Sequence, residues 1–421
     1  MTIAVIVFLL VIGLIATERV DRTKIAMAGA GVVVVLAGSG FDQEHAIEAI
    51  DFNTIGLLAG MMILVALTRA TGVYDFIAIR AGQISKGRPL PVVLALAGTT
   101  ALLSAFLDNL TTILLVVPVT FLLCDALDID PIPLIVIEII ASNIGGTATL
   151  IGDPPNIIIA GHTGLSFNEF LVNLAPIAAI TFVVVVAGLY AVFRSRLQVE
   201  EKNRRFVMDL DAASSIRDPD ELRRTGPVLV GTILLFFAHQ ALGLEPATVA
   251  LMGATVALLV TGQKLDEVLA KIEWPTLFFF LALFVIVGAL EETGAIDKVA
   301  EGVANLTGGN RTAELLGILW IGGFGSAIVD NIPFTTAMIP VVDGLVPAGG
   351  DNAYWWALSL GACFGGNATI IAAAANVAAS GLAERAGQPI GFTRFLKFGL
   401  PATLISLLLA TAWVMVVYVL L

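Results

Sequence analysis

Asp108-Asn109-Leu110-Thr111-Thr112 recurs in the second half of the chain as Asp330-Asn331-Ile332-Pro333-Phe334-Thr335-Thr336. In both copies a proline comes ten residues after the aspartate, at Pro118 and at Pro340. Both copies lie in apolar stretches, where carboxylates, amides and prolines are costly. Two matched polar sets in apolar sequence predict one site built between two halves of a membrane protein. That arrangement is typical of secondary transporters.

A second pair of polar stretches follows the first. Gly145-Gly146-Thr147-Ala148-Thr149 leads to Asn156, and Gly365-Gly366-Asn367-Ala368-Thr369 leads to Asn376. The first half has two prolines before its asparagine, whereas the second half has alanines. Proline removes a backbone donor and clashes with the preceding turn, so we expect a broken helix in each half and a wider break in the first. The glycines fit two interpretations equally, lining of a site or close helix packing.

Composition fixes the class of protein. Of 421 residues, 58% are hydrophobic and 13% are charged, and the mean hydropathy is +0.95. Soluble domains carry about 25% charged residues. Long uncharged runs predict a polytopic α-helical membrane protein that lies in a lipid bilayer. The net charge of −12 comes from acidic loops and gives no reason to expect a nucleic-acid partner.

The basic residues predict the topology. Arg194–Gly226 is the longest polar stretch and holds eight of the 22 lysines and arginines, so we place it in the cytoplasm. Threading the chain from there puts both termini outside. Five spans per half is an odd number, which inverts the second half relative to the first. The compact loops fit a prokaryotic inner membrane.

The predicted fold is all-α, with two inverted-topology repeats. Each repeat has about five transmembrane helices, one of them discontinuous at a midplane site, and one re-entrant hairpin. The predicted boundaries are residues 1–193 for repeat 1 (hairpin 90–124, broken helix 131–160), 194–226 for the cytoplasmic connector, and 227–421 for repeat 2 (hairpin 312–347, broken helix 353–381).

The hairpin aspartates have two interpretations. Each precedes a helix that is expected to begin at the tip, and aspartate is a good N-cap, so capping alone would explain Asp108 and Asp330. The alternative is a proton carrier, because an ionised carboxylate at the midplane costs several kcal/mol unless it is paired or protonated.

Three further residues have no counterpart in the other half. Glu138 lies in an apolar span and is a candidate proton relay or a structural partner; Asp153 lies in the first break. Cys363 just precedes the second Gly-Gly pair. Its thiol is a candidate soft ligand for a metalloid, or else a small buried hydrophobe.

At these motifs the chain resembles the ion transporter superfamily. The Asp-Asn tips and the string Thr149-Leu150-Ile151-Gly152-Asp153-Pro154-Pro155-Asn156 are similar to the branch holding arsenite efflux permeases, NhaD-type sodium/proton antiporters and the melanosomal P protein. The resemblance implies a scaffold domain that can form a homodimer and a transport domain that carries both hairpins in an elevator-like movement. No enzymatic activity and no cofactor are expected, and the coupling ion would be H⁺ or Na⁺.

The expected functional residues form one set around the tips and the breaks. Asp108, Asp330 and Glu138 are expected to couple protons. The residues expected to bind the solute or ion are Asp108, Asn109, Thr111, Thr112, Gly145, Gly146, Thr147, Thr149, Asp153, Asn156, Asp330, Asn331, Thr335, Thr336, Gly365, Gly366, Asn367, Thr369 and Asn376.

Several cargoes remain open. The superfamily's dicarboxylate carriers have serine where this chain has the tip aspartates, and a fixed acid disfavours an anion. The first hypothesis is therefore proton-coupled efflux of arsenite or antimonite, with a cytoplasmic ATPase as a partner if the chain is an arsenite pump. Sodium/proton antiport is the second hypothesis, and an anion or dicarboxylate carrier or an anion channel are the others.

Overall fold

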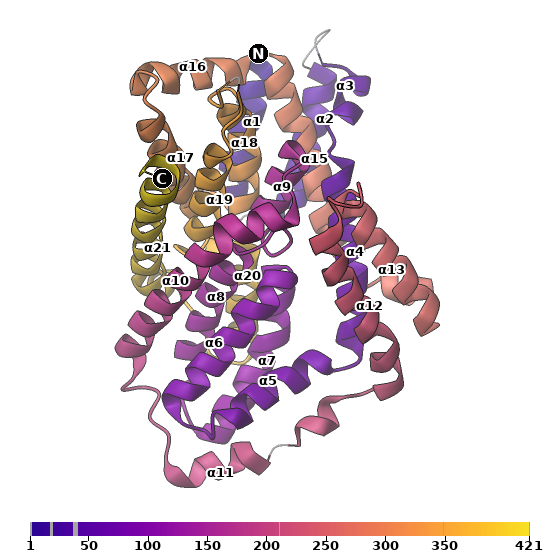
Figure 1. Cartoon of the computed structure of the whole chain (residues 1–421), viewed down its shortest axis with the longest axis vertical. Helices are drawn as coiled ribbons and strands as arrows, with labels where there is room; N and C mark the ends of the chain where they lie inside the picture. Colours follow the sequence, from indigo (N-terminus) through magenta and orange to yellow (C-terminus); the bar gives the residue numbers. More distant parts are fainter. Residues whose placement is uncertain (1, 17–19, 37–40, 210, 348, 421) are drawn as a thin grey trace.

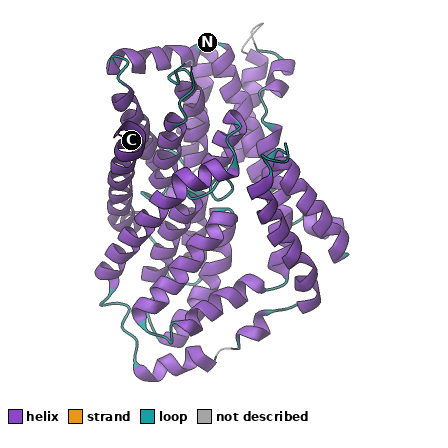
Figure 2. Ribbon diagram, viewed as in Figure 1, coloured by secondary structure: helices purple, strands orange, loops and turns teal. Residues whose placement is uncertain are grey.

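The computed structural model describes residues 2–16, 20–36, 41–209, 211–347 and 349–420, and the regular structure within them is entirely helical (Figures 1 and 2). The all-α membrane fold predicted from composition is confirmed. In the first half the helices are α1 (Thr2–Ala16), α2 (Arg22–Leu36), α3 (Gln43–Glu48), α4 (Phe52–Ala70), α5 (Val73–Ile84), α6 (Pro89–Phe106), α7 (Asn109–Leu127), α8 (Ile132–Gly146), α9 (Pro154–Thr163) and α10 (Phe167–Phe193).

The connector and the second half continue the series. They contain α11 (Glu201–Asp209), η2 (Ala212–Ser215), α12 (Pro219–Ala238), α13 (Pro246–Thr261), α14 (Leu265–Leu269), α15 (Trp274–Glu292), α16 (Ala295–Thr307), α17 (Arg311–Ile328), α18 (Asn331–Asp343), α19 (Ala353–Gly365), η3 (Ile370–Ala372), α20 (Ala374–Arg385), α21 (Phe392–Val414) and the π-helical end η4 (Met415–Leu420).

Six of the described helices are long and apolar enough to cross a bilayer. Two of them, α6 and α7, are consecutive arms joined at Leu107 and Asp108. The other four are α4, α10, α15 and α21 with its continuation. Shorter apolar helices include α1, α8 and α13. Length and hydropathy alone would therefore count both arms of the first hairpin as spans and neither arm of the second.

The internal repeat is visible in the helix bounds. A single offset in residue number relates α4 to α15 at both ends, and the same offset relates α6 to α17 at both ends. Helices α5 and α16, which were not predicted from the sequence, also begin at this offset. The starts of α9 and α20 are related by a slightly smaller one. The two halves therefore repeat their helices in the same order.

The two hairpins open toward opposite ends of the molecule. The last carbonyl of α7, at Leu127, accepts a hydrogen bond of 3.2 Å from Asn203 of α11. Helix α16 packs instead against α17 and α18. In Figure 1 α11 lies at the end away from the N-terminus, and α16 lies at the N-terminal end. The tips of both hairpins therefore point toward the interior from opposite sides.

Each hairpin is tied to the other half of the chain. α7 packs against α20, and α18 packs against α9. These helices, with α6, α8, α17 and α19, form a central group (Figure 1). α2 packs along α15 and α4 packs along α13, which makes a second group beside the first.

The predicted difference in width between the two breaks is wrong. Helix is absent at 147–153 in the first half and at 366–373 in the second, where only the short η3 intervenes. The prolines do not widen the first break, because they occupy the first turn of α9, where a missing N–H is harmless. Asparagine side chains hold both breaks instead, as described below.

Two glycines of the Gly-Gly pairs serve close packing. A Cβ on Gly145 of α8 would overlap the backbone of Ala101 in α6. A Cβ on Gly365 of α19 would overlap the backbone of Gly323 in α17. Both positions let the first arm of a hairpin lie directly against the broken helix of its own half. A role of the same glycines in binding stays a prediction.

We expect Gly145→Ala to destabilise the protein by about 3 kcal/mol or more, because the new methyl meets rigid backbone and not a movable side chain. The yield of monodisperse protein and its melting temperature in detergent measure this. Gly98→Ala is the control. Gly98 lies on α6, the hairpin arm that Gly145 packs against, and a Cβ there meets nothing within 4 Å. Equal melting temperatures for the two variants would contradict the packing argument.

Candidate functional site

The hairpin aspartates are N-caps, as the capping interpretation requires. Asp108 caps α7 and accepts hydrogen bonds from the backbone N–H of Thr111 at 2.8 Å and from its hydroxyl at 2.5 Å. Asp330 caps α18 and accepts from the backbone N–H of Ile332 at 3.0 Å. Capping does not account for all the contacts of Asp330, because its other oxygen lies 2.6 Å from the guanidinium of Arg22.

Both hairpin tips meet at Asp153. Asn109 of the first tip donates to the Asp153 Oδ1 at 3.3 Å, and Asn331 of the second tip donates to the same oxygen at 3.0 Å. Asp153 is fully buried, and its Oδ2 has no hydrogen-bond partner among the described residues. Within the described part of the chain no lysine, arginine or histidine pairs with it. A buried charge without a cation is expensive, so this carboxyl group is poised to hold a proton or a cation.

Asn143 connects the two halves behind the tips. Its Oδ1 accepts from Asn109 at 3.1 Å. Its Nδ2 lies within 3.4 Å of the Gly366 carbonyl, 3.1 Å of the Asn367 Oδ1 and 3.0 Å of the Asn376 Oδ1. Asn143 is not among the site residues predicted from the sequence; it lies inside the helical part of α8, two residues before the Gly-Gly pair.

Two matched asparagines hold the helix breaks. The Asn156 Nδ2 donates to the carbonyls of Thr147 and Thr149 at 3.1 and 2.8 Å. The Asn376 Nδ2 donates to the carbonyls of Gly366 and Thr369 at 2.7 Å each. Carbonyls released by a broken helix must find donors when they are buried. One amide side chain meets that need in each half.

The threonine hydroxyls mostly serve the local backbone. Thr147, Thr335 and Thr336 each donate to the carbonyl four residues earlier in the chain. Thr149 and Thr369 donate to the carbonyls of Ala105 and Ala327, which fastens each break to the hairpin arm of its own half. The hydroxyl hydrogens of these five threonines are therefore already used in hydrogen bonds to backbone carbonyls.

Two buried polar groups remain without partners close to the tips. The hydroxyl of Thr112 and the Nδ2 of Asn367 make no hydrogen bond to any described residue. Together with the Asp153 Oδ2 they supply free donors and an acceptor on the residues that surround the network. Unpaired buried polar groups are costly, and a bound solute or ion would satisfy them.

Cys363 lies inside the site and Glu138 lies outside it. The Cys363 Sγ is 3.6 Å from the Asn156 Oδ1 and also contacts Asp153. Glu138 is fully buried, but it accepts a hydrogen bond of 2.5 Å from Thr120. Thr120 is eleven residues along α7 from Asn109, which corresponds to about 16 Å of helix. The structure thus brings Cys363 to the tips and leaves Glu138 apart from them.

Cavities adjoin the tips on the sides that face the second group of helices. One, of about 530 Å³, is lined by Asp330 and Arg22. Another, of about 410 Å³, is lined by Thr111 and by Arg69, Lys271 and Glu273. The first cavity has charged side chains from both helix groups, whereas in the second the charged side chains lie opposite the neutral Thr111 of the hairpin.

Arg22 was missed as a site residue. From the sequence alone, the basic residues near this position are interpreted as loop charges that set the topology. In the structure Arg22 is the first residue of α2 and reaches the tip of the second hairpin, 308 residues away in the chain. Nothing in the local sequence marks this contact.

The chain is similar over its whole length to known membrane proteins. The sequence profile of the family described as citrate transporter (CitMHS) matches residues 12–361. The uncharacterized transporter Mb2703 of Mycobacterium bovis is 43% identical over 422 residues, which cover 99% of this chain and 98% of the relative. Human P protein is 33% identical over 502 residues, which cover 99% of this chain and 60% of P protein.

The crystal structure of the YdaH transporter of Alcanivorax borkumensis shares the fold. The TM-score is 0.63 at 15% sequence identity, and the match covers 98% of each chain. The resemblance drawn from the hairpin tips and the broken helix is confirmed by these relatives. The protein is a multi-pass membrane transporter and belongs to the CitMHS citrate transporter family, within the ion transporter superfamily.

Proposed function

We propose that the protein is a proton-coupled secondary transporter in which Asp153 carries the coupled proton. The observation behind this proposal is the position of Asp153, which is fully buried and bonded by both hairpin tips, with a free oxygen and no described cation beside it. A proton and a cargo that compete for that oxygen cannot bind together. Mutually exclusive binding at one site is the elementary condition for exchange of two solutes across a membrane.

The two tip aspartates contribute differently in this proposal. Asp108 accepts hydrogen bonds from Thr111 and forms no ion pair with any described residue, so it is a second binding position for the proton. Asp330 is paired with Arg22 and is released only when that pair opens. Glu138, with one free oxygen, is proposed as a relay between the site and the connector end of α7.

Arsenite or antimonite is the cargo that we propose first. Trivalent arsenic at neutral pH is an uncharged trihydroxide, which needs neutral donors and acceptors. The unpaired Thr112 hydroxyl, Asn367 amide and Asp153 oxygen have that chemistry. The Cys363 thiol beside Asp153 adds a soft ligand. Na⁺ is the competing cargo, because the same carboxylate would also accept a hard cation.

An organic anion is the second candidate. The sequence argument against anions was the fixed acid at each tip, and Arg22 neutralises one of the two. Arg69, Lys271 and Arg217 line the cavity beside Thr111. The family is described as citrate transporters, which also favours a carboxylate. In a carrier of this class, these three basic side chains would attract the anion into the cavity.

Movement of one helix group against the other would give alternating access. The hairpins belong to one group through the α7–α20 and α18–α9 contacts, and cavities lie along its boundary with α2 and α4, where α15 also touches α18 and α4 touches α9. This division supports an elevator-like movement in a bacterial inner membrane, with the second group as the scaffold of a homodimer. A cytoplasmic ATPase is a proposed partner only if arsenite is the cargo.

Proton flux in liposomes tests the proposal. Purified protein with a trapped pH dye is challenged separately with arsenite, antimonite, sodium and citrate. A pH change with the metalloids alone supports arsenite efflux, with sodium alone supports cation/proton antiport, and with citrate alone supports the anion carrier. Saturable uptake of a labelled cargo with no pH change for any of the four would overturn proton coupling.

A further inference from the structure

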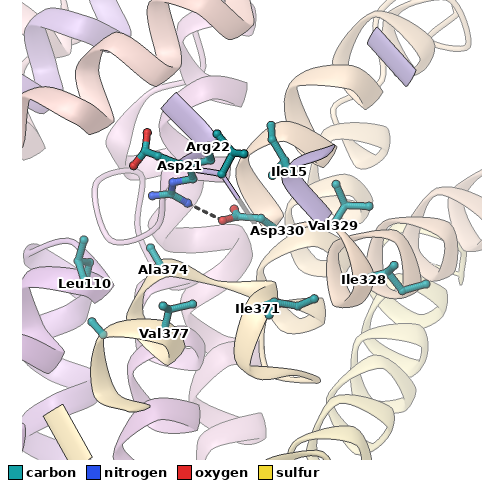
Figure 3. Close-up of a pocket in the computed structure, with 12 residues that line it drawn as sticks. Ile15, Asp21, Arg22, Leu110, Ile328, Val329, Asp330, Ile371, Ala374 and Val377 are labelled. Carbon is teal, nitrogen blue, oxygen red and sulfur yellow. Dashed lines mark hydrogen bonds and ion pairs between the residues drawn. The ribbon is translucent and has the colours of Figure 1, made fainter. Parts of the chain in front are cut away.

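The ion pair between Arg22 and Asp330 crosses a cavity between two helix groups. Figure 3 shows the Arg22 side chain reaching over the cavity to Asp330, while the carboxylate of Asp21 points away from Asp330. The Nη1 to Oδ2 distance is 2.6 Å. The side chain of Asp330 is 9% exposed and that of Arg22 is 26% exposed. The pair therefore lies largely away from solvent, where it is screened little.

Two further contacts hold Arg22 and its neighbour in α2 against α15. Its neighbour Thr23 donates a hydrogen bond of 3.0 Å from its hydroxyl to the carbonyl of Pro275. The Arg22 guanidinium also lies over the ring of Phe279, 5.1 Å from its centre. Both contacts hold the guanidinium in place from the α2–α15 side. The ion pair is thus a bond between the scaffold side and the tip of the second hairpin.

The first hairpin has no equivalent bond. Asp108 occupies the matching cap position with φ −65°, and no ion pair to it is formed by any described residue. Asp330 has φ +83°, a conformation that is unfavourable for any residue except glycine. Strained backbone of this kind persists where the surroundings hold it. At the second tip Asp330 is held by the cap bond from Ile332 and by the ion pair with Arg22.

We infer that Arg22 is a positioning residue that latches the second hairpin to α2 and α15. The tip leaves α2 when Asp330 loses its charge or when another anion occupies the guanidinium. The hairpins thereby differ in function, with the first one free to respond to cargo and the second one released by breaking an ion pair. This inference rests on the proposed alternating access, since a latch matters only if the two groups separate.

Cysteine labelling tests the latch without any transport measurement. Val329 lines the cavity next to Asp330, and the native Cys124 and Cys363 are buried. Val329→Cys is reacted with a maleimide reagent in purified protein, in the parent background and with Arg22→Gln, Arg22→Lys or Lys24→Gln. We expect labelling at least tenfold faster with Arg22→Gln, and a rate near the parent with Arg22→Lys. The exposed Lys24, two residues further along α2, is the matched control and should change nothing.

Asp330→Asn separates a latch from a general loss of structure. If Arg22 acts through Asp330, Asp330→Asn alone speeds labelling to the same extent, and adding Arg22→Gln to it has no further effect. Additive effects of the two changes, or an unchanged rate in Asp330→Asn, would overturn the inference. Asp330→Asn also serves alone if Arg22→Gln does not give monodisperse protein. The labelling needs neither cargo nor a proton gradient, so failure of the proposed function and failure of the latch are distinguishable.

Discussion

Replacing Asp153 by asparagine is expected to reduce uphill, proton-driven transport by about a hundredfold or more, the lower part of the range for a positioned proton-transfer group. The asparagine oxygen can still accept from Asn109 and Asn331, so the two tips stay joined. The amide cannot take up or release a proton in the physiological range. Exchange of labelled for unlabelled cargo should therefore survive, while accumulation against a gradient is lost.

Liposomes with an imposed pH gradient measure this loss. Asp125→Asn is the control, because it removes an exposed carboxylate at the far end of α7. Both variants should melt at the temperature of the parent protein. Uphill transport at the parent rate in Asp153→Asn would mean that Asp108 or Asp330, and not Asp153, carries the coupled proton. Loss of exchange as well would mean that the cargo requires the carboxylate of Asp153 and does not bind the amide that replaces it.

The sequence predicted the tips and the breaks because both violate the rules of a membrane span. Paired Asp-Asn and Gly-Gly motifs in apolar sequence are costly, and their recurrence at a nearly constant spacing reveals the repeat. Asp153 was placed in the site for the same reason. Its central position depends on the convergence of Asn109 and Asn331, which lie 44 and 178 residues away in the chain. A single sequence carries no signal for such a convergence.

Other features were hidden for different physical reasons. Arg22 looks like any base beside a short apolar helix, and only the fold brings it to Asp330. Asn143 lies within a regular helix and makes its connections through its side chain, so no break in the sequence pattern marks it. The prediction of a wider first break was wrong because it considered only the ability of proline to disrupt a helix. In the first turn of α9 it disrupts nothing, and asparagine bonds decide the geometry.

Removing the side chain of Asn376 is expected to destabilise the protein by about 3 kcal/mol or more, because each unsatisfied buried group costs roughly 1–3 kcal/mol. Asn376→Ala leaves the carbonyls of Gly366 and Thr369 without their donor and removes the Oδ1 that Asn143 binds. All of these groups are buried, so water does not replace the lost bonds. A fall of about 3 °C or more in the melting temperature in detergent is the expected result.

Two further variants make the Asn376 measurement specific. Asn352→Ala is the control, since this exposed asparagine at the start of α19 makes no side-chain cap bond. Asn156→Ala should cost a similar amount, because Asn156 makes the same pair of bonds in the first break. Melting of Asn376→Ala within a degree or so of the control would show that the second break holds its shape without the amide. A large fall in melting temperature for Asn156→Ala alone would mean that only the first break depends on its asparagine for stability. The two breaks would then be held differently despite their matched hydrogen bonds.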